Sequence, residues 1–140
     1  MENKEKETPS FIKYHAGLSL FFNPAEMVFA LQMANYEYLK QSGYLINFSK
    51  SGYALRMGMK EYTFEKCVDR FMELKMLAKN YNAMGNRVHY SFNMELYNKL
   101  IRITAQAGGR SRLPAFFDRI KKEPHRVESI IEEEILGLGS

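Results

Sequence analysis

The feature that most constrains the fold is the stretch from residue 49 to residue 77, where two helical patterns meet at a single glycine. Apolar side chains recur at helical spacing on both sides of Gly58: Tyr53, Ala54 and Met57 before it, and Phe64, Cys67, Val68, Phe71 and Leu74 after it. Because glycine adopts a positive φ readily, the second helix can swing across the first at this point. The stretch therefore predicts a helix-turn-helix pair whose second helix has one buried stripe and one free stripe.

Length and composition limit the alternatives. A chain of 140 residues that is 46% hydrophobic is long enough for one domain with short appendages. The single cysteine, Cys67, cannot form an internal disulfide, so nothing indicates an oxidising compartment. The charged first ten residues do not resemble a signal peptide, and no apolar run approaches the roughly 20 residues that a membrane helix needs. We therefore expect a cytoplasmic protein with no membrane partner.

The net charge of +4 is unevenly distributed. Residues 10–126 are basic, whereas residues 127–140 carry only acidic charges. A basic body favours anionic partners, nucleic acid first, although an ordinary solvated surface would have a similar balance.

The segments before the helix pair are predicted to support it. Residues 1–10 are expected to be disordered, and a short strand is expected at Leu18–Phe22. Asn23 and Glu26 predict a capping box for a helix that stops at Gly43. Its apolar face is expected to form core and comprises Met27, Val28, Leu31, Ala34, Tyr38 and Leu39. Tyr44–Phe48 is expected to be an extended connection or a small strand, and Ser49 or Ser51 to cap the next helix.

The segments after the pair predict a hairpin and more helices. Residues 79–92 are predicted to form a hairpin, and Met84-Gly85-Asn86 suits its turn. The return arm alternates, with Val88, Tyr90 and Phe92 on one face and Arg87, His89 and Ser91 on the other. Asn93 is expected to cap a further helix that ends before Gly108. The domain is therefore predicted at residues 11–107. Residues 108–140 would be a basic and then acidic amphipathic tail that docks on its own domain or on a second copy.

This order of elements is similar to that of winged helix-turn-helix domains. In the region that members of that class use for their helix pair, the matching positions are Ala54, Met57, Gly58, Met59, Lys60, Thr63 and Phe64. Two positions depart from the pattern. Lys60 replaces the usual capping serine, and Lys75 replaces a glycine, which predicts a less tight turn into the wing. The resemblance implies a mainly α (α+β) fold with a three-helix core, a β-hairpin wing and additional C-terminal helices.

A second resemblance concerns the segment RVHYSFNMELYNKL, which looks like the corresponding part of RepL-type plasmid replication initiators. It implies replication initiation for a plasmid, phage or mobile element as an alternative to regulation of transcription.

The two resemblances together imply a bacterial, nucleoid-associated protein that binds double-stranded DNA in a sequence-specific way. It would act as a homodimer through residues 127–138 or 94–105. Spacing on the second helix places Tyr62, Lys66 and Arg70 on one exposed stripe, and Glu61, Glu65, Asp69 and Glu73 on its neighbour. The residues predicted to contact DNA are Lys50, Ser51, Arg56, Lys60, Tyr62, Thr63, Lys66, Arg70, Asn82, Asn86 and Arg87.

Other functions have weaker support from the sequence. The acidic stripe favours a third hypothesis, a winged helix used only for protein contacts. His15, His89 and His125 lie far apart without partners at metal-ligand spacing, so neither a metal nor a cofactor is expected. Cys67 lies on the buried stripe, where a core thiol is expected rather than a nucleophile. We expect no enzymatic activity.

Overall fold

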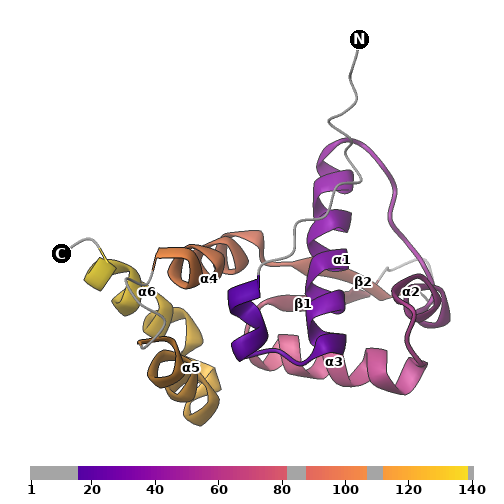
Figure 1. Cartoon of the computed structure of the whole chain (residues 1–140). Helices are drawn as coiled ribbons and strands as arrows, with labels where there is room; N and C mark the ends of the chain where they lie inside the picture. The colour runs from indigo at the N-terminus through magenta and orange to yellow at the C-terminus, as the bar shows by residue number, and fades with distance from the viewer. Residues whose placement is uncertain (1–15, 82–87, 107–111, 139–140) are drawn as a thin grey trace.

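The computed structural model describes residues 16–81, 88–106 and 112–138, and the described chain is mainly helical with one two-stranded hairpin (Figure 1). Its elements are η2 (Ala16–Leu20), α1 (Pro24–Gln41), α2 (Lys50–Met57), α3 (Glu61–Glu73), β1 (Leu77–Tyr81), β2 (Val88–Phe92), α4 (Met94–Gln106), α5 (Leu113–Lys122), η4 (Pro124–Arg126) and α6 (Val127–Leu138). The predicted disorder at residues 1–10, the turn at residues 84–86 and the helix end at Gly108 lie outside the described residues.

The strand predicted at Leu18–Phe22 is wrong, because the chain forms the 3₁₀ helix η2 there. Leu18, Phe21 and Phe22 are all buried, and their spacing suits one face of a helical turn. In a strand, Phe21 and Phe22 would point to opposite faces. Gly17 lets η2 approach α4 closely, since a Cβ at this position would lie 2.8 Å from the Cβ of Thr104.

Helix α1 begins as predicted, with the Asn23 side chain accepting from the Glu26 amide and the Glu26 carboxylate accepting from the Asn23 amide. It ends at Gln41, and Gly43, the predicted stop, follows two residues later with a φ of +96°. The predicted apolar face is partly wrong, because Val28 and Tyr38 are exposed. The buried residues are Met27, Phe29, Ala30, Met33 and Tyr36. Apolar side chains surround much of this helix, so its neighbours rather than its own pattern select the buried face.

Helices α2 and α3 form the pair that the apolar spacing predicts. Ser49 caps α2 by accepting from the Gly52 amide, and Gly58 ends the helix with a φ of +69°. All five predicted apolar residues of the second helix are buried, at 3% exposure or less. Lys60 is the N-cap of α3, and its side chain makes no capping hydrogen bond, as its replacement of serine predicts.

The turn from α3 into β1 is tight, contrary to the prediction drawn from Lys75. Lys75 adopts a φ of +63°, the left-handed conformation that usually favours glycine. Its amide donates to the Met72 carbonyl, and the Met76 amide donates to the Phe71 carbonyl. These two bonds form a Schellman motif. Burial of Met76, at 1% exposure, holds the turn in place despite the strain at Lys75.

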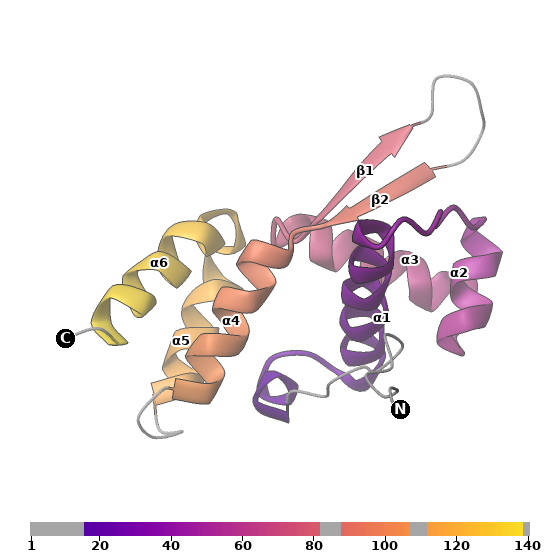
Figure 2. The same ribbon diagram turned by 90° about the horizontal axis from the view of Figure 1, so that it is seen from above.

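The predicted hairpin forms, with β1 and β2 antiparallel and Lys79 opposite Tyr90. As predicted, Tyr90 and Phe92 face inward whereas Ser91 is exposed. Helix α1 binds the free edge of β2 through two side chains: Glu37 accepts from the Phe92 amide and Lys40 donates to the Tyr90 carbonyl. Figure 2 shows the far end of the hairpin projecting beyond the helices. Tyr44–Phe48, in contrast, forms no strand with any described segment.

Helices α4, α5 and α6 lie together beside the first half of the molecule (Figures 1 and 2). Asn93 caps α4, as predicted, by accepting from the Leu96 amide. Helix α6 packs on α4, and the apolar residues of these two helices share the interior, with Leu100, Ile103, Ile130 and Ile131 at 0% exposure. Much of the apolar surface that was predicted to serve a dimer is therefore buried within the chain, whereas Leu136 of α6 is 73% exposed. No described helix is long and apolar enough to span a bilayer.

Candidate nucleic-acid interface

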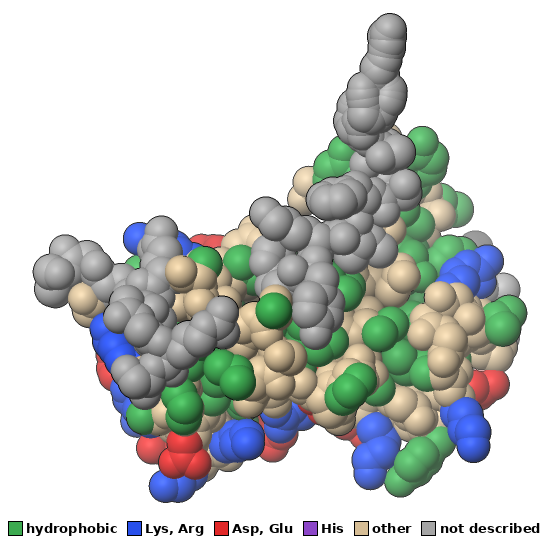
Figure 3. Space-filling view, in the orientation of Figure 1, with side chains coloured by type: hydrophobic (Ala, Val, Ile, Leu, Met, Phe, Trp, Pro, Cys, Tyr) green, Lys and Arg blue, Asp and Glu red, His purple; other side chains and the backbone are tan. Residues whose placement is uncertain are grey.

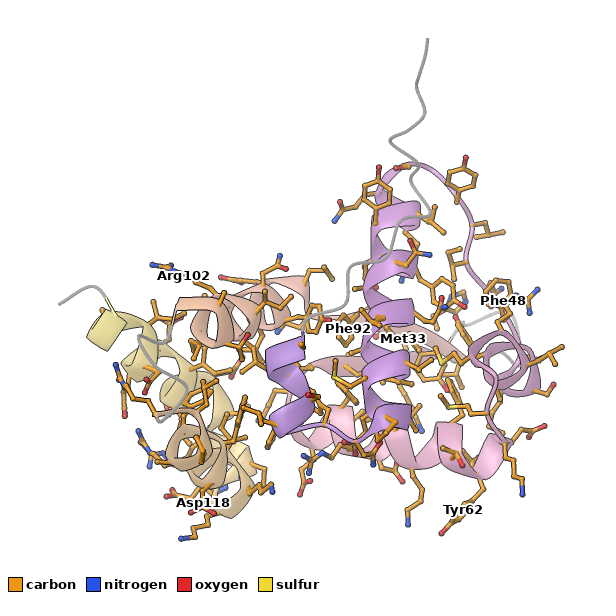
Figure 4. The ribbon with its side chains drawn as sticks, in the orientation of Figure 1. Met33, Phe48, Tyr62, Phe92, Arg102 and Asp118 are labelled. Atoms are coloured by element: carbon orange, nitrogen blue, oxygen red, sulfur yellow. The ribbon has the colours of Figure 1, made fainter. Side chains whose placement is uncertain are left out.

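The outer face of α3 combines exposed cations, acids and one large aromatic ring. Tyr62 is 67% exposed and points away from the body of the molecule (Figure 4). Lys66 lies one turn further along and donates to the Tyr62 hydroxyl at 3.2 Å. Asp69 and Glu73 are also exposed on this helix, as is Glu61 in its first turn. In Figure 3, blue side chains project along the lower margin over α3 and α5 with red ones between them.

Arg70 does not belong to this exposed stripe, so the predicted Tyr62–Lys66–Arg70 alignment is wrong. Its guanidinium lies 4.7 Å from the centre of the Phe21 ring, and its Nε lies 3.5 Å from the Glu26 carboxylate. The side chain is only 27% exposed. Helical rotation turns residue 70 toward α1 and the turn that follows η2, which the four-residue spacing alone did not reveal. Arg70 therefore connects α3 with α1 and with that turn.

The first turn of α3 has two predicted contact residues on the free side of the helix. Lys60 is exposed and makes no ion pair with any described residue, and Thr63 is half-buried. Because three of the first four amides of a helix lack partners within it, this end carries a partial positive charge. Asn82, Asn86 and Arg87, predicted on the wing, lie outside the described residues.

Helix α2 presents the remaining predicted residues. Lys50 forms an ion pair with Glu65 of α3, and hydrogen bonding to that carboxylate raises the pKa of Lys50 above its usual value. Ser51 is exposed, 3.2 Å from the Ser49 hydroxyl. Arg56 stacks on Phe48, with its guanidinium 3.7 Å from the ring centre. Arg56 is thus oriented but remains exposed.

A groove of about 370 Å³ lies between α3 and the hairpin, and we call it the α3–hairpin groove. Charged residues from three elements line it together with apolar ones: Lys50, Glu65, Asp69, Lys79, Val88 and Tyr90. Lys79 was not among the predicted site residues. Its place follows from the register of the hairpin, in which Lys79 lies opposite the inward-facing Tyr90 and shares its face, and the sequence alone does not give that register.

Other chemistry has little support among the described residues. Burial raises the pKa of the Cys67 thiol to about 11, with a smaller contribution from the Glu26 carboxylate, so the thiol is protonated near neutral pH. Residues 16–81, 88–106 and 112–138 contain no group of three His, Cys, Asp or Glu side chains that could hold a metal ion.

Comparisons of the chain with protein families, with curated proteins and with solved structures found no match.

Proposed function

We propose that this chain is a winged helix-turn-helix protein that binds double-stranded DNA through α3. The observation that carries the proposal is the pairing of α2 and α3 at Gly58, beside a hairpin, with Tyr62 and Lys66 exposed on the outer face of α3. A helix presented in this way fits the major groove, and an adjacent hairpin can reach the flanking backbone.

The proposed contacts divide by chemistry. Lys60 and Lys66 would bind phosphates, whereas Tyr62 and Thr63 would reach base edges from the first turns of α3. Lys50, Ser51 and Arg56 would bind the backbone beside α2. Arg70 is removed from this set, because its side chain is held between Phe21 and Glu26.

The biological role that we propose first is regulation of transcription, with replication initiation as the alternative. Regulators of this kind read paired half-sites as homodimers. Most apolar side chains of α4 and α6 are buried within the chain, so a dimer formed through these helices would use the apolar surface that they leave exposed, such as Leu136.

Selection of bound duplexes from a random pool tests the proposal directly. Recovery of a defined sequence would support DNA reading, and a palindrome would reveal paired half-sites and their spacing. Location of that sequence in a promoter or in a replication origin would separate the two roles. Failure to retain any duplex at low salt would refute the proposal.

A matched pair of double variants locates the binding face. Lys60→Ala with Lys66→Ala should weaken duplex binding and reduce the salt dependence of the affinity by about 0.9 in the logarithmic slope for each lost phosphate contact. Lys121→Ala with Lys122→Ala removes the same charge from α5 and should have a much smaller effect. Equal weakening by the two pairs would exclude α3 as the contact face.

The acidic side chains on α3 favour a second candidate, a winged helix that binds a protein partner. Glu61, Asp69 and Glu73 are exposed on the same helix as the proposed DNA contacts. Asp69→Asn with Glu73→Gln distinguishes the candidates, because loss of like-charge repulsion should tighten DNA binding. If the wild type binds no DNA, and the same double variant no longer binds a basic protein that the wild type binds, the protein-contact candidate is favoured.

A further inference from the structure

Two cations and two carboxylates line the α3–hairpin groove. Lys50 comes from the first turn of α2 and Lys79 from β1, whereas Glu65 and Asp69 both come from α3. The four side chains have no net charge, so the groove as it stands attracts a polyanion only weakly.

The two lysines differ in how they are held. Lys50 is paired with Glu65 across the α2–α3 contact. Lys79 makes no ion pair with any residue in the described part of the chain, although its pairing opposite Tyr90 turns it toward the groove. One cation is therefore available to an incoming anion, and the other is already neutralised by this chain.

The ion pair between Lys50 and Glu65 is exposed, with 47% and 50% of the two side chains open to solvent. Exposed pairs of this kind contribute little to stability, so the lysine can exchange one anionic partner for another. A phosphate offers the same charge-assisted hydrogen bond as the carboxylate. The groove is also bordered by α3 and the hairpin, the two elements that the proposed function places on DNA.

We propose that the groove receives one backbone strand of DNA, and that Glu65 competes with its phosphate for Lys50. Glu65 is thus an internal substitute for the phosphate, and it sets both the affinity and the salt dependence of binding. This inference rests on the proposed function. It adds Lys79 as a second phosphate contact and gives one of the acidic residues of α3 a regulatory role.

The test is a double-mutant cycle on Lys50 and Glu65, read as affinity for one duplex over a series of salt concentrations. Glu65→Gln should tighten binding several-fold and steepen the logarithmic salt slope by about 0.9, because Lys50 then adds a full charge to the interface. Lys79→Ala should weaken binding and reduce the slope by a similar amount. In a Lys50→Ala background, the gain from Glu65→Gln should largely disappear.

Glu132→Gln is the matched control. It removes the same charge and breaks another exposed pair, between Lys99 of α4 and Glu132 of α6, which does not line the groove; Lys99 keeps Glu95 as a second partner. Glu132→Gln should change the affinity for DNA only slightly. The size of this change should be similar to the change that Glu65→Gln causes in the Lys50→Ala background. Thermal unfolding of each variant would show whether a change in binding comes from a loss of folded protein. Glu65→Ala provides a second variant that removes the same carboxylate.

Two failures are distinguishable. If the wild type binds duplex DNA but Glu65→Gln has no effect, or has the same effect with and without Lys50, the competition is refuted while the proposed function stands. If the wild type retains no duplex at low salt, the proposed function fails and this inference fails with it.

Discussion

The spacing of Arg70 on α3 predicts an exposed DNA contact, but its side chain packs within the fold. It is four residues from Lys66, yet it packs against Phe21 and pairs with Glu26, which is itself part of the capping box of α1. A cation over an aromatic ring and a largely buried ion pair each add modest stability. The charge of Arg70 is therefore used within the fold.

We expect Arg70→Ala to lower the free energy of unfolding by about 1–2 kcal/mol, because it removes both contacts and leaves Glu26 without its cation. Lys66→Ala, on the exposed side of the same helix, should change it by less than about 0.5 kcal/mol. Urea unfolding followed by far-UV circular dichroism measures both. Equal stability of the two variants would contradict the assignment of Arg70 to the fold.

Tyr97 carries a buried hydroxyl that has no hydrogen-bond partner among the described residues. Burial raises its pKa to about 12. Because the pKa in the folded state exceeds the unfolded value near 10, its contribution to stability is complete below about pH 10 and is lost as the pH rises toward 12.

Tyr97→Phe keeps the ring, which packs 5.2 Å from Phe92, and removes the buried hydroxyl. We expect the variant to be as stable as the wild type at pH 7 or more stable by up to about 1 kcal/mol. It should also lose less stability than the wild type between pH 10 and 12. Chemical unfolding across this pH range is the measurement, with the exposed Tyr38→Phe as the control. A large destabilisation at pH 7 would mean that the hydroxyl has a partner.

Among the elements, the turn after α3 is where the prediction from sequence differs most from the structure. Lys75 predicted a loose connection, since lysine is disfavoured at positive φ. Here the surrounding structure overrides the backbone preference of lysine. Burial of Met76 and the two hydrogen bonds of the Schellman motif require the left-handed conformation, whatever residue occupies the position.

Lys75→Gly should therefore raise the free energy of unfolding by about 1 kcal/mol, by relieving the strain at φ +63°. Lys75→Ala is the informative control, because it removes the same charge but keeps the Cβ that causes the strain. Thermal and urea unfolding should place the alanine variant close to the wild type. A gain of equal size in both variants would indicate a charge effect instead.

Features that depend on residues close together in the sequence could be predicted. Features that depend on contacts with residues far apart in the sequence could not. The capping box at Asn23, the turn at Gly58, the cap at Asn93 and the inward side of β2 all follow from short-range patterns. The short helix η2 does not, because a brief apolar run suits a strand or a helical turn equally. The position of Lys79 in the groove required the register of the hairpin.

At the scale of the whole molecule, adjacent phenylalanines connect the two halves of the core. Phe22 stacks on Phe71 of α3, with ring centres 4.9 Å apart, and Phe21 stacks on Phe117 of α5 at 4.8 Å. The buried residues of all the helices form one hydrophobic cluster. The C-terminal helices are therefore part of the same packed interior as α3, which the sequence alone left open.

Because the core is continuous, we predict that a destabilising substitution in α5 also destabilises α3. Phe117→Ala should lower the free energy of unfolding by about 3–5 kcal/mol, the usual effect of emptying a phenylalanine site in a core. Cys67, buried on α3 with a pKa raised to about 11, provides a native probe at a distance from the mutation.

If the molecule unfolds as one unit, Phe117→Ala should raise the rate of thiol labelling at Cys67 in proportion to the loss of stability seen by circular dichroism. Tyr62→Ala, which removes an exposed side chain from α3 itself, should change neither measurement appreciably. Unaltered labelling of Cys67 in the Phe117 variant would instead mean that α5 and α6 unfold independently, and that the stacked Phe21 and Phe22, which follow η2, do not couple the two halves.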